Sequence, residues 1–342
     1  MNMPLHQDPV GSDAVPALAV LAHDALASCH ADLLAARQTV LTARDPVGIH
    51  GTRVALRRMR AAATLFGRPL ADEAILALRA DAKLLADACG PTRDLDVFLI
   101  GVLKEAEASF ADHDAVLHEL RSFRAAALRL RRTRHDAARR VLTGDVFTAF
   151  DARLASLPAP TEPPPPAEPT VPPPLSAVPG DAVAVSDVPP PMPAPSVPDA
   201  LGFARDVLRG RDRKLRKGLE RFRRLDGAQR HALRLRVKKQ RYAASFLSKL
   251  FDRKAAGAYI QAAAGMQDAL GLANDRLVAA KVIADIRAAA RPKGRLDWIA
   301  GVLTGWLAGR AQAGGDDDRA VASAGKRFRK AARFWRGGDD GE

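Results

Sequence analysis

The chain has 342 residues, of which 53 are Lys or Arg and 39 are Asp or Glu, so its formal net charge is +14. Its two cysteines, Cys29 and Cys89, are too few for a disulfide scaffold, and we expect both to be reduced and buried. We expect no signal peptide and no transmembrane segment, because His23 and Asp24 interrupt the N-terminal apolar run and WIAGVLTGWLAG is too short to cross a bilayer.

The residue pattern predicts an all-α, cytoplasmic protein. Ala and Leu, both good helix formers, dominate the apolar residues, and no segment alternates apolar and polar residues as a strand does. Asp45-Pro46 should end the first helix, because the residue before proline avoids the α region. The expected helices are 13–43, 49–66, 71–89, 93–108, 112–142 and 145–156 in the first half, and 199–225, 228–250, 254–270, 274–290, 295–312 and 317–336 in the second.

The third helix of each half is expected to end at a glycine. Gly90-Pro91 and Gly271 are typical helix stops. Thr92 and Asn274 follow them and are residue types that cap the next helix.

Residues 158–198 hold 17 of the 24 prolines and contain no Lys or Arg. Proline fixes φ and lacks a backbone donor, so this segment should form a disordered connector, either a plain spacer or a ligand for a proline-binding partner. It separates a first half at 13–157 from a second half at 199–336. Without the connector, 53 basic residues face 35 acidic ones, so the positive charge belongs to the folded halves.

The two halves repeat each other at an offset of 181 residues without a gap. This repeat indicates two copies of one structural unit. The aligned pairs are His50 with His231, Arg53 with Arg234, Arg57 with Lys238, Arg58 with Lys239, Arg60 with Arg241, Gly90 with Gly271 and Asp94 with Asp275.

One helix of each copy carries a stripe of cations. At 100° per residue, apolar residues gather on one side of the helix and a histidine with three cations on the other, while Arg58 stands apart. A solvated face mixes signs, yet no acid lies between His50 and Phe66 or between His231 and Leu250, so we expect an anion site. We call these residues the basic stripes: His50, Arg53, Arg57 and Arg60 in the first copy, and His231, Arg234, Lys238 and Arg241 in the second.

Three further cations are candidates for the same site. Arg79 and Lys83 lie four residues apart on one predicted helix, and Arg93 lies near the start of the next, where it could reach a phosphate. The two histidines could donate hydrogen bonds to a phosphate or could fix the packing of the helices, and the sequence leaves both open.

The motifs HGTRVALRRMR with GPTRDLDV, and HALRLRVKKQRY with GLANDRLV, resemble those of the CHAD domain, the conserved histidine α-helical domain. GVLTGWLAGR and the terminal RFW also look similar to this family. The resemblance implies two pseudo-symmetric four-helix bundles with a basic groove or pore between them, which bind inorganic polyphosphate. By the motif match, the implied ligand residues are His50, Arg53, Arg57, Arg58, Arg60, His231, Arg234, Lys238, Lys239 and Arg241.

Other members of the family associate with polyphosphate or polyhydroxyalkanoate granules, so the resemblance also implies granule association and a granule protein as partner. The chain lacks the Glu-x-Glu-x-Lys motif of the triphosphate-tunnel domain that many relatives carry, so we expect a stand-alone module. The connector is unusually long for the family.

Two other classes of function remain open. An enzyme acting on phosphate would need a nucleophile, a metal or a phosphate loop. We expect none of these, and no cofactor or metal ligand. Asp87 with Asp94 is the nearest candidate for a catalytic pair of acids, but both residues suit helix capping or pairing with arginines. A nucleic-acid protein would carry a recognition motif or stacking aromatics. Since both are missing, we expect only weak, nonspecific binding of nucleic acid.

Overall fold

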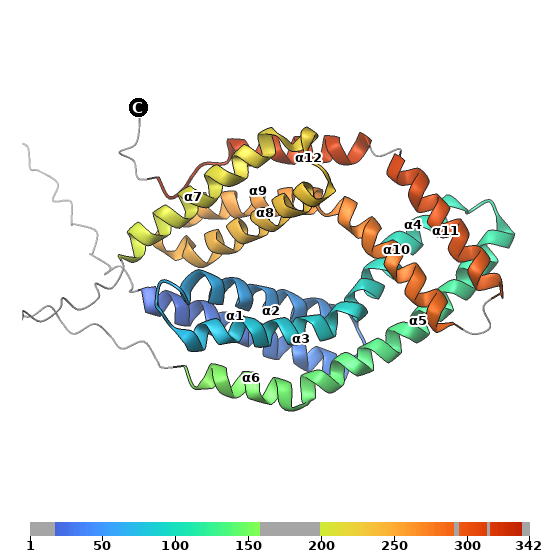
Figure 1. Cartoon of the computed structure of the whole chain (residues 1–342), viewed down its shortest axis with the longest axis horizontal. Helices are drawn as coiled ribbons and strands as arrows, with labels where there is room; N and C mark the ends of the chain where they lie inside the picture. Colours follow the sequence, from blue (N-terminus) through green and yellow to red (C-terminus); the bar gives the residue numbers. More distant parts are fainter. Residues whose placement is uncertain (1–17, 158–198, 291–293, 313–314, 337–342) are drawn as a thin grey trace, which may run out of the picture.

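The computed structural model describes residues 18–157, 199–290, 294–312 and 315–336. Helices make up nearly all of these residues (Figure 1). The described residues contain no strand, so the predicted all-α fold is confirmed. The connector predicted at 158–198 lies outside the described residues, as does the start of the helix predicted at 13–43.

The helices follow the expected order in both halves. The first half contains α1 (Leu18–Thr42), α2 (Pro46–Phe66), α3 (Glu73–Val97), the π-helical turn η1 (Phe98–Val102), α4 (Leu103–Ser109), α5 (Asp114–Thr143) and α6 (Asp145–Ala155). The second half contains α7 (Ala200–Glu220), η2 (Phe222–Arg224), α8 (Gly227–Leu247), η3 (Ser248–Leu250), α9 (Arg253–Ala269), α10 (Leu272–Ala289), α11 (Gly294–Gln312) and α12 (Gly315–Lys330).

The helix stop predicted at Gly90-Pro91 is wrong, because α3 continues through both residues. Pro91 is exposed, so its ring and its missing N–H disturb only the solvent side of the helix. Thr92 is consequently a buried residue of the helix interior and does not cap a new helix. Gly90 has a different reason to be small: a Cβ there would lie 3.0 Å from Nη1 of Arg53 on α2.

The corresponding stop in the second half is correct. α9 ends at Ala269 and α10 begins at Leu272, with Gly271 between them. Asn274 does not cap α10, however, because the helix has already begun two residues earlier and Gly271 occupies the capping position without a side-chain hydrogen bond. The same stretch of the repeat therefore forms one continuous helix in the first half and two helices in the second.

The helix bounds follow the offset of the sequence repeat. α2 and α8 are separated by 181 residues at both ends. The segment from α3 to α4 corresponds to the segment from α9 to α10 in the same way, apart from the break at Gly271. That a twofold axis relates the two halves stays a prediction.

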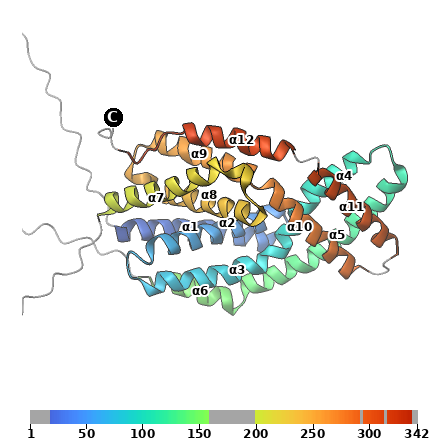
Figure 2. The same ribbon diagram turned by 45° about the horizontal axis from the view of Figure 1, so that its top comes forward.

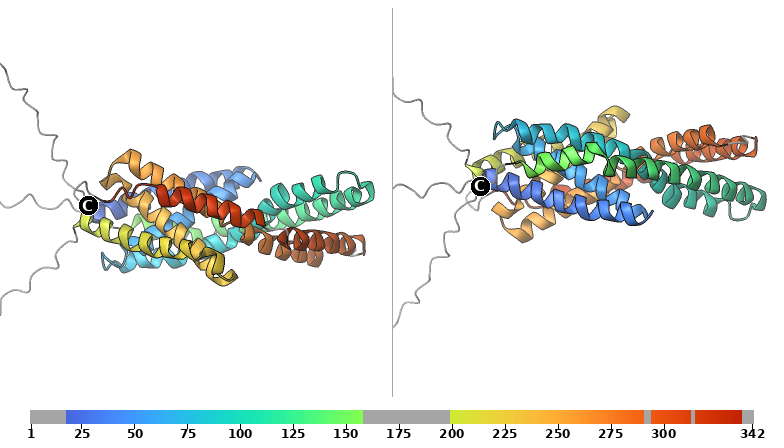
Figure 3. Two further views of the ribbon diagram at one scale, coloured as in Figure 1. Left: turned by 90° about the horizontal axis from the view of Figure 1, so that it is seen from above. Right: turned by 90° about the horizontal axis from the view of Figure 1, so that it is seen from below.

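Two apolar cores hold the molecule together. The larger one joins α1, α2, α3 and α6 to α7, α8, α9 and α12, so both halves contribute to it. The smaller one lies at one end, which we call the tip, where the end of α3, η1, α4 and α5 pack against α10 and α11. Figures 2 and 3 show the tip extending beyond the larger group of helices. There the pair α4 and α5 of the first half lies beside the pair α10 and α11 of the second.

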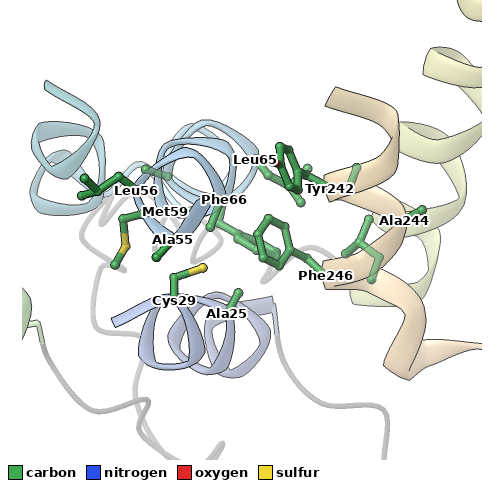
Figure 4. Close-up of a cluster of buried hydrophobic side chains, with 14 of the residues drawn as sticks. Ala25, Cys29, Ala55, Leu56, Met59, Leu65, Phe66, Tyr242, Ala244 and Phe246 are labelled. Carbon is green, nitrogen blue, oxygen red and sulfur yellow. The ribbon is translucent and has the colours of Figure 1, made fainter. Parts of the chain in front are cut away.

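An aromatic contact joins α2 to α8 at the end remote from the tip. The ring centroids of Phe66 and Phe246 are 6.4 Å apart. Leu65 and Tyr242 lie beside this pair (Figure 4), and all four side chains are buried. The α2–α8 seam is thus bounded by an aromatic contact at one end and by the tip at the other.

Among the described helices, α1 is long and apolar enough to cross a membrane by length and composition. Its apolar residues also fit a role in the core, because Leu21, Leu26, Cys29 and Leu33 are buried against the rest of the protein. Cys29 and Cys89 are both free and buried, as predicted, and burial raises the pKa of each thiol to about 11.

Candidate functional site

The two basic stripes lie on helices whose opposite sides form core. On α2, Leu56 and Met59 are fully buried, and on α8 Leu233 and Val237 occupy the same role. The starts of both helices are fixed locally. The Asp45 carboxylate accepts from Val47 N at 2.6 Å with Pro46 in the first turn, and α8 begins with a capping box between Asp226 and Gln229.

Lys238 shows that the two stripes share one environment. Burial, followed by the charges of Arg234, Arg57, Arg53 and Arg241, lowers the pKa of Lys238 from 10.5 to about 8. Two of these arginines lie on α8 and two on α2. The cations of the two halves are therefore close enough to repel one another across the α2–α8 seam.

Several guanidinium groups of the stripes keep unused donors. The Nε atoms of Arg57, Arg60 and Arg234 are buried and have no hydrogen-bond acceptor within the described part of the chain. A buried donor without an acceptor costs stability. Oxygen atoms of a bound anion would satisfy these donors, with the planar geometry that guanidinium groups offer to phosphate.

Two members of the stripes are held by protein contacts. Arg53 Nη1 donates to the carbonyl oxygen of Ala86 at 2.7 Å, one turn before Pro91 on α3, and burial lowers the pKa of Arg53. Arg241 Nε donates to Oε1 of Gln267 at 3.2 Å, and its guanidinium lies 4.7 Å from the centre of the Tyr242 ring. Both side chains are thus positioned before any ligand arrives, and Arg53 also ties α2 to α3.

The histidines lie at the exposed start of each stripe, nearest the tip. Partial burial lowers the pKa of His50, and the charges of Arg93, Arg57 and Arg53 add to that effect while Asp96 opposes it. These effects favour the neutral form of His50 in the ligand-free protein. Whether the histidines contact a ligand or fix packing stays open, although their exposure favours contact with a ligand.

Two predicted ligand residues point away from the seam. Arg58 forms an ion pair with Asp32 of α1, consistent with its separate place on the helical wheel. Lys239 is exposed, and its carbonyl oxygen accepts a hydrogen bond from Arg211 Nη1 of α7 at 3.1 Å. Arg58 and Lys239 occupy equivalent positions of the repeat. Each contacts the first helix of its own half, Arg58 through its side chain and Lys239 through its backbone carbonyl.

The three further candidate cations, Arg79, Lys83 and Arg93, all lie on α3 but in two different environments. Arg93 belongs with the stripe, because its charge lowers the pKa of His50. Lys83 Nζ bonds instead to the carboxylate of Asp87 at 2.6 Å, on the exposed side of the helix. Arg79 is exposed on the same helix and is not brought to the stripe by any contact within the described residues.

The acids near the site suit electrostatic tuning better than metal binding. Burial raises the pKa of Asp94, whereas the neighbouring Arg53 and Lys281 oppose that rise. In the described ranges, no group of three or more His, Cys, Asp or Glu is arranged to hold a metal ion. Asp87 is paired with Lys83, and not with an arginine as the sequence suggested.

A buried polar cluster behind His50 was not predicted from the sequence. Asp96 is 1% exposed and accepts a 2.5 Å bond from Nε of Arg131 on α5, beside the buried His135. Burial raises the pKa of Asp96, and Arg131 opposes the rise. Only the spacing of Asp96 two residues after Asp94 could have hinted at this cluster, since its partners lie 35 and more residues away.

Comparisons with known proteins agree with this fold. The family model described as CHAD domain matches residues 24–284. The crystal structure of the CHAD domain from the plant Ricinus communis aligns with a TM-score of 0.68 at 22% identity, covering 98% of this chain and 99% of that one. PptA from Streptomyces chartreusis aligns with a TM-score of 0.56 at 17% identity, covering 92% and 99%. No protein of curated function matches the sequence.

Proposed function

This chain belongs to the CHAD family, a family associated with polyphosphate binding, and from that premise we propose that it binds inorganic polyphosphate along the two basic stripes without catalysing any reaction on it. The observation that carries the proposal is the set of buried Nε donors on both helices, at Arg57, Arg60 and Arg234, which have no acceptor within the described residues. The lowered pKa of Lys238, caused in part by arginines of both helices, agrees with it. Like charges held this close repel, and a shared polyanion would remove the repulsion.

Polyphosphate suits the seam better than a ligand with one phosphate. Its negative charges repeat along a flexible chain, and the stripes repeat cations along α2 and α8 from the histidines toward Phe66 and Phe246. Contacts on both helices raise the effective concentration of one chain at each. The unpaired Nε donors of Arg57, Arg60 and Arg234 would be satisfied along the way.

We further propose that the protein acts in the cytoplasm, at polyphosphate or polyhydroxyalkanoate granules, where a granule protein could hold it in place. Granules that contain polyphosphate would recruit the chain through the stripes themselves. A fluorescent fusion should then colocalise with such granules, and the same fusion with reversed stripe charges should disperse.

The direct test is a titration of labelled polyphosphate against the whole chain at physiological salt. The test variant combines Arg57→Glu, Arg234→Glu and Lys238→Glu, and Arg53 stays unchanged because it ties α2 to α3. We expect affinity to fall on the order of 100-fold or more, because each charge-assisted contact contributes about 1.5–3 kcal/mol.

A matched control separates the site from the net charge of the protein. Arg121, Arg132 and Arg139 are exposed on α5 and form no ion pair within the described residues, so their change to Glu alters the net charge equally. The control should weaken binding several-fold at most. Equal losses in both variants, or wild-type affinity in the folded test variant, would refute the proposal. DNA of equal charge should bind more weakly than polyphosphate, and the reverse order would favour a nucleic-acid ligand.

A further inference from the structure

A second basic hollow lies in the second half, between α7 and the start of α8. It has a volume of about 570 Å³, within the roughly 300–1,000 Å³ of small-molecule pockets. Four cations line it: Lys214, Lys217 and Arg221 from the α7 side, and Arg236 from α8. No acid lines it.

The four cations of the hollow carry no neutralising partner. All four are exposed, and within the described residues none of them forms an ion pair, whereas Arg216 on the same helix α7 pairs with Asp212 at 2.7 Å. A neighbouring hollow that shares Arg221 differs in this respect, because Glu220 and Asp318 line it together with its arginines. The absence of acids is therefore a property of this hollow and not of the whole surface.

The hollow also has apolar lining residues, Leu225, Ala232 and Leu233, which we call its apolar floor. Gly218 permits the close approach of the two helices, since a Cβ there would lie 2.7 Å from Cδ1 of Leu233. The first turn of α8 adds no free N–H donor at Gln229, because the Asp226 carboxylate already accepts from Gln229 N at 2.8 Å. Gln229 N is therefore not available to a ligand.

The equivalent place in the first half has a different lining. There α1 and α2 pack closely, and a Cβ on Gly51 would lie 2.9 Å from the Cβ of Ala36. Arg236 corresponds to Ala55, which is buried. At the offset of 181, the equivalents of the three cations from the α7 side are Leu33, Ala36 and Val40. An offset of 182 aligns the buried residues of α1 and α7 better, and it gives Asp32, Ala35 and Thr39. In neither alignment is one of them a cation.

The hollow faces away from the basic stripes. Residues two apart on a helix point about 160° from each other, so Arg236 and the stripe residue Lys238 lie on nearly opposite sides of α8. A ligand in the hollow would therefore not touch the α2–α8 seam, and its binding does not depend on polyphosphate binding to the stripes.

We propose that this hollow is a second anion site, which takes a compact organic di- or triphosphate with an apolar, planar body, such as a nucleoside triphosphate. A volume of about 570 Å³ suits a small molecule. The four cations match two or three phosphate groups. Leu225, Ala232 and Leu233 give the body of the ligand an apolar surface to cover.

The experiment uses ATP as the probe in metal-free buffer, titrated calorimetrically into the whole chain after saturation with long-chain polyphosphate. Polyphosphate occupies the stripes, so any remaining ATP binding reports on the hollow. We expect one ATP per chain. Lys217→Ala with Arg236→Ala should weaken ATP binding about 100-fold, since each lost charge-assisted contact is worth about tenfold or more.

Two further variants separate a shaped site from a charged surface. Ala232→Phe fills the floor and keeps every cation, so it should abolish ATP binding and leave polyphosphate binding unchanged. Arg132→Ala with Arg139→Ala on α5 removes the same charge elsewhere and should leave ATP binding unchanged. Thermal melting confirms that each variant is folded.

Several results would overturn the proposal. They are the absence of ATP binding to the polyphosphate-saturated chain, wild-type ATP binding in the Ala232→Phe variant, and equal losses in the hollow and control variants. Inorganic tripolyphosphate that binds as tightly as ATP under the same conditions would also overturn it, because the apolar floor would then contribute nothing. Loss of polyphosphate binding in the stripe variant with ATP binding intact would show that the two sites are independent.

Discussion

The two halves of this protein meet at two seams of opposite character. At the tip, side chains of opposite charge pair across the halves. Arg134 bonds to Asp285 at 2.9 Å, and Arg295 bonds to Glu119 at 3.1 Å. Apolar residues of both halves, among them Phe98 and Ile283, fill the space between α3, α5 and α10.

The α2–α8 seam places like charges together instead. Arg57 of α2 and Arg234 of α8 both lower the pKa of Lys238, and neither α2 from His50 onward nor α8 from His231 onward contains an acid. Complementary contacts at the tip and the Phe66–Phe246 pair hold the halves in place. The comparison indicates that the tip provides stability, and that the seam carries unneutralised charge which a polyanion can use.

The largest expected effect comes from breaking the tip. Phe98 is 1% exposed and packs against Phe123 at a centroid distance of 6.2 Å. Phe98→Ala should lower the free energy of unfolding by about 3–5 kcal/mol, because a large cavity replaces the ring. Urea denaturation measures this change. A loss below about 1 kcal/mol would show that the tip contributes little to stability.

The next effect concerns pH and the seam. Lys238 has a pKa of about 8 in the free protein, and a bound polyanion raises it, so binding takes up a proton above pH 8. Affinity for polyphosphate should therefore fall as the pH rises above 8, by up to about tenfold per unit. Lys238→Arg stays charged throughout this range and should lose that part of the pH dependence. An identical pH profile in both proteins would contradict the close meeting of the stripes.

The smallest expected effect concerns the free energy of unfolding, which should change in opposite directions when one charge is removed from each seam. Lys238→Gln relieves repulsion and should raise the free energy of unfolding by up to about 1 kcal/mol. Arg134→Gln leaves Asp285 without one of its two partners and should lower it by a similar amount. Denaturation of the two variants at low salt compares them, and changes of the same sign would remove the distinction between the seams.

Much of this arrangement follows from local sequence, and the rest does not. The amphipathic pattern of α2 and α8 predicts the stripes, because helical period depends on neighbouring residues. Asp45-Pro46 predicted only the end of the first helix, and in the structure it also starts α2, which begins at Pro46 and not at residue 49. The helix stop predicted at Pro91 was wrong, because the free-energy cost of a proline inside a helix depends on which side of α3 faces solvent. Arg53 was predicted as a ligand residue, yet its bond to the Ala86 carbonyl depends on how α2 packs on α3.

Contacts between residues far apart in the chain were equally beyond local reasoning. Asp96 pairs with Arg131 within the first half, and Phe66 packs against Phe246 across the two halves. The hollow beside Arg236 was missed for another reason. The repeat emphasises what the copies share, whereas this hollow exists only where they differ.

The central claim is that the two stripes bind one polyphosphate chain together. Isothermal titration of a polyphosphate of defined length, short enough to bind a single protein, tests it most directly in the wild type and in the Arg57→Glu and Lys238→Glu variants. A shared site predicts one chain per protein in all three, with weaker affinity in each variant. Two chains per protein in the wild type, with one of them lost in each variant, would contradict the claim.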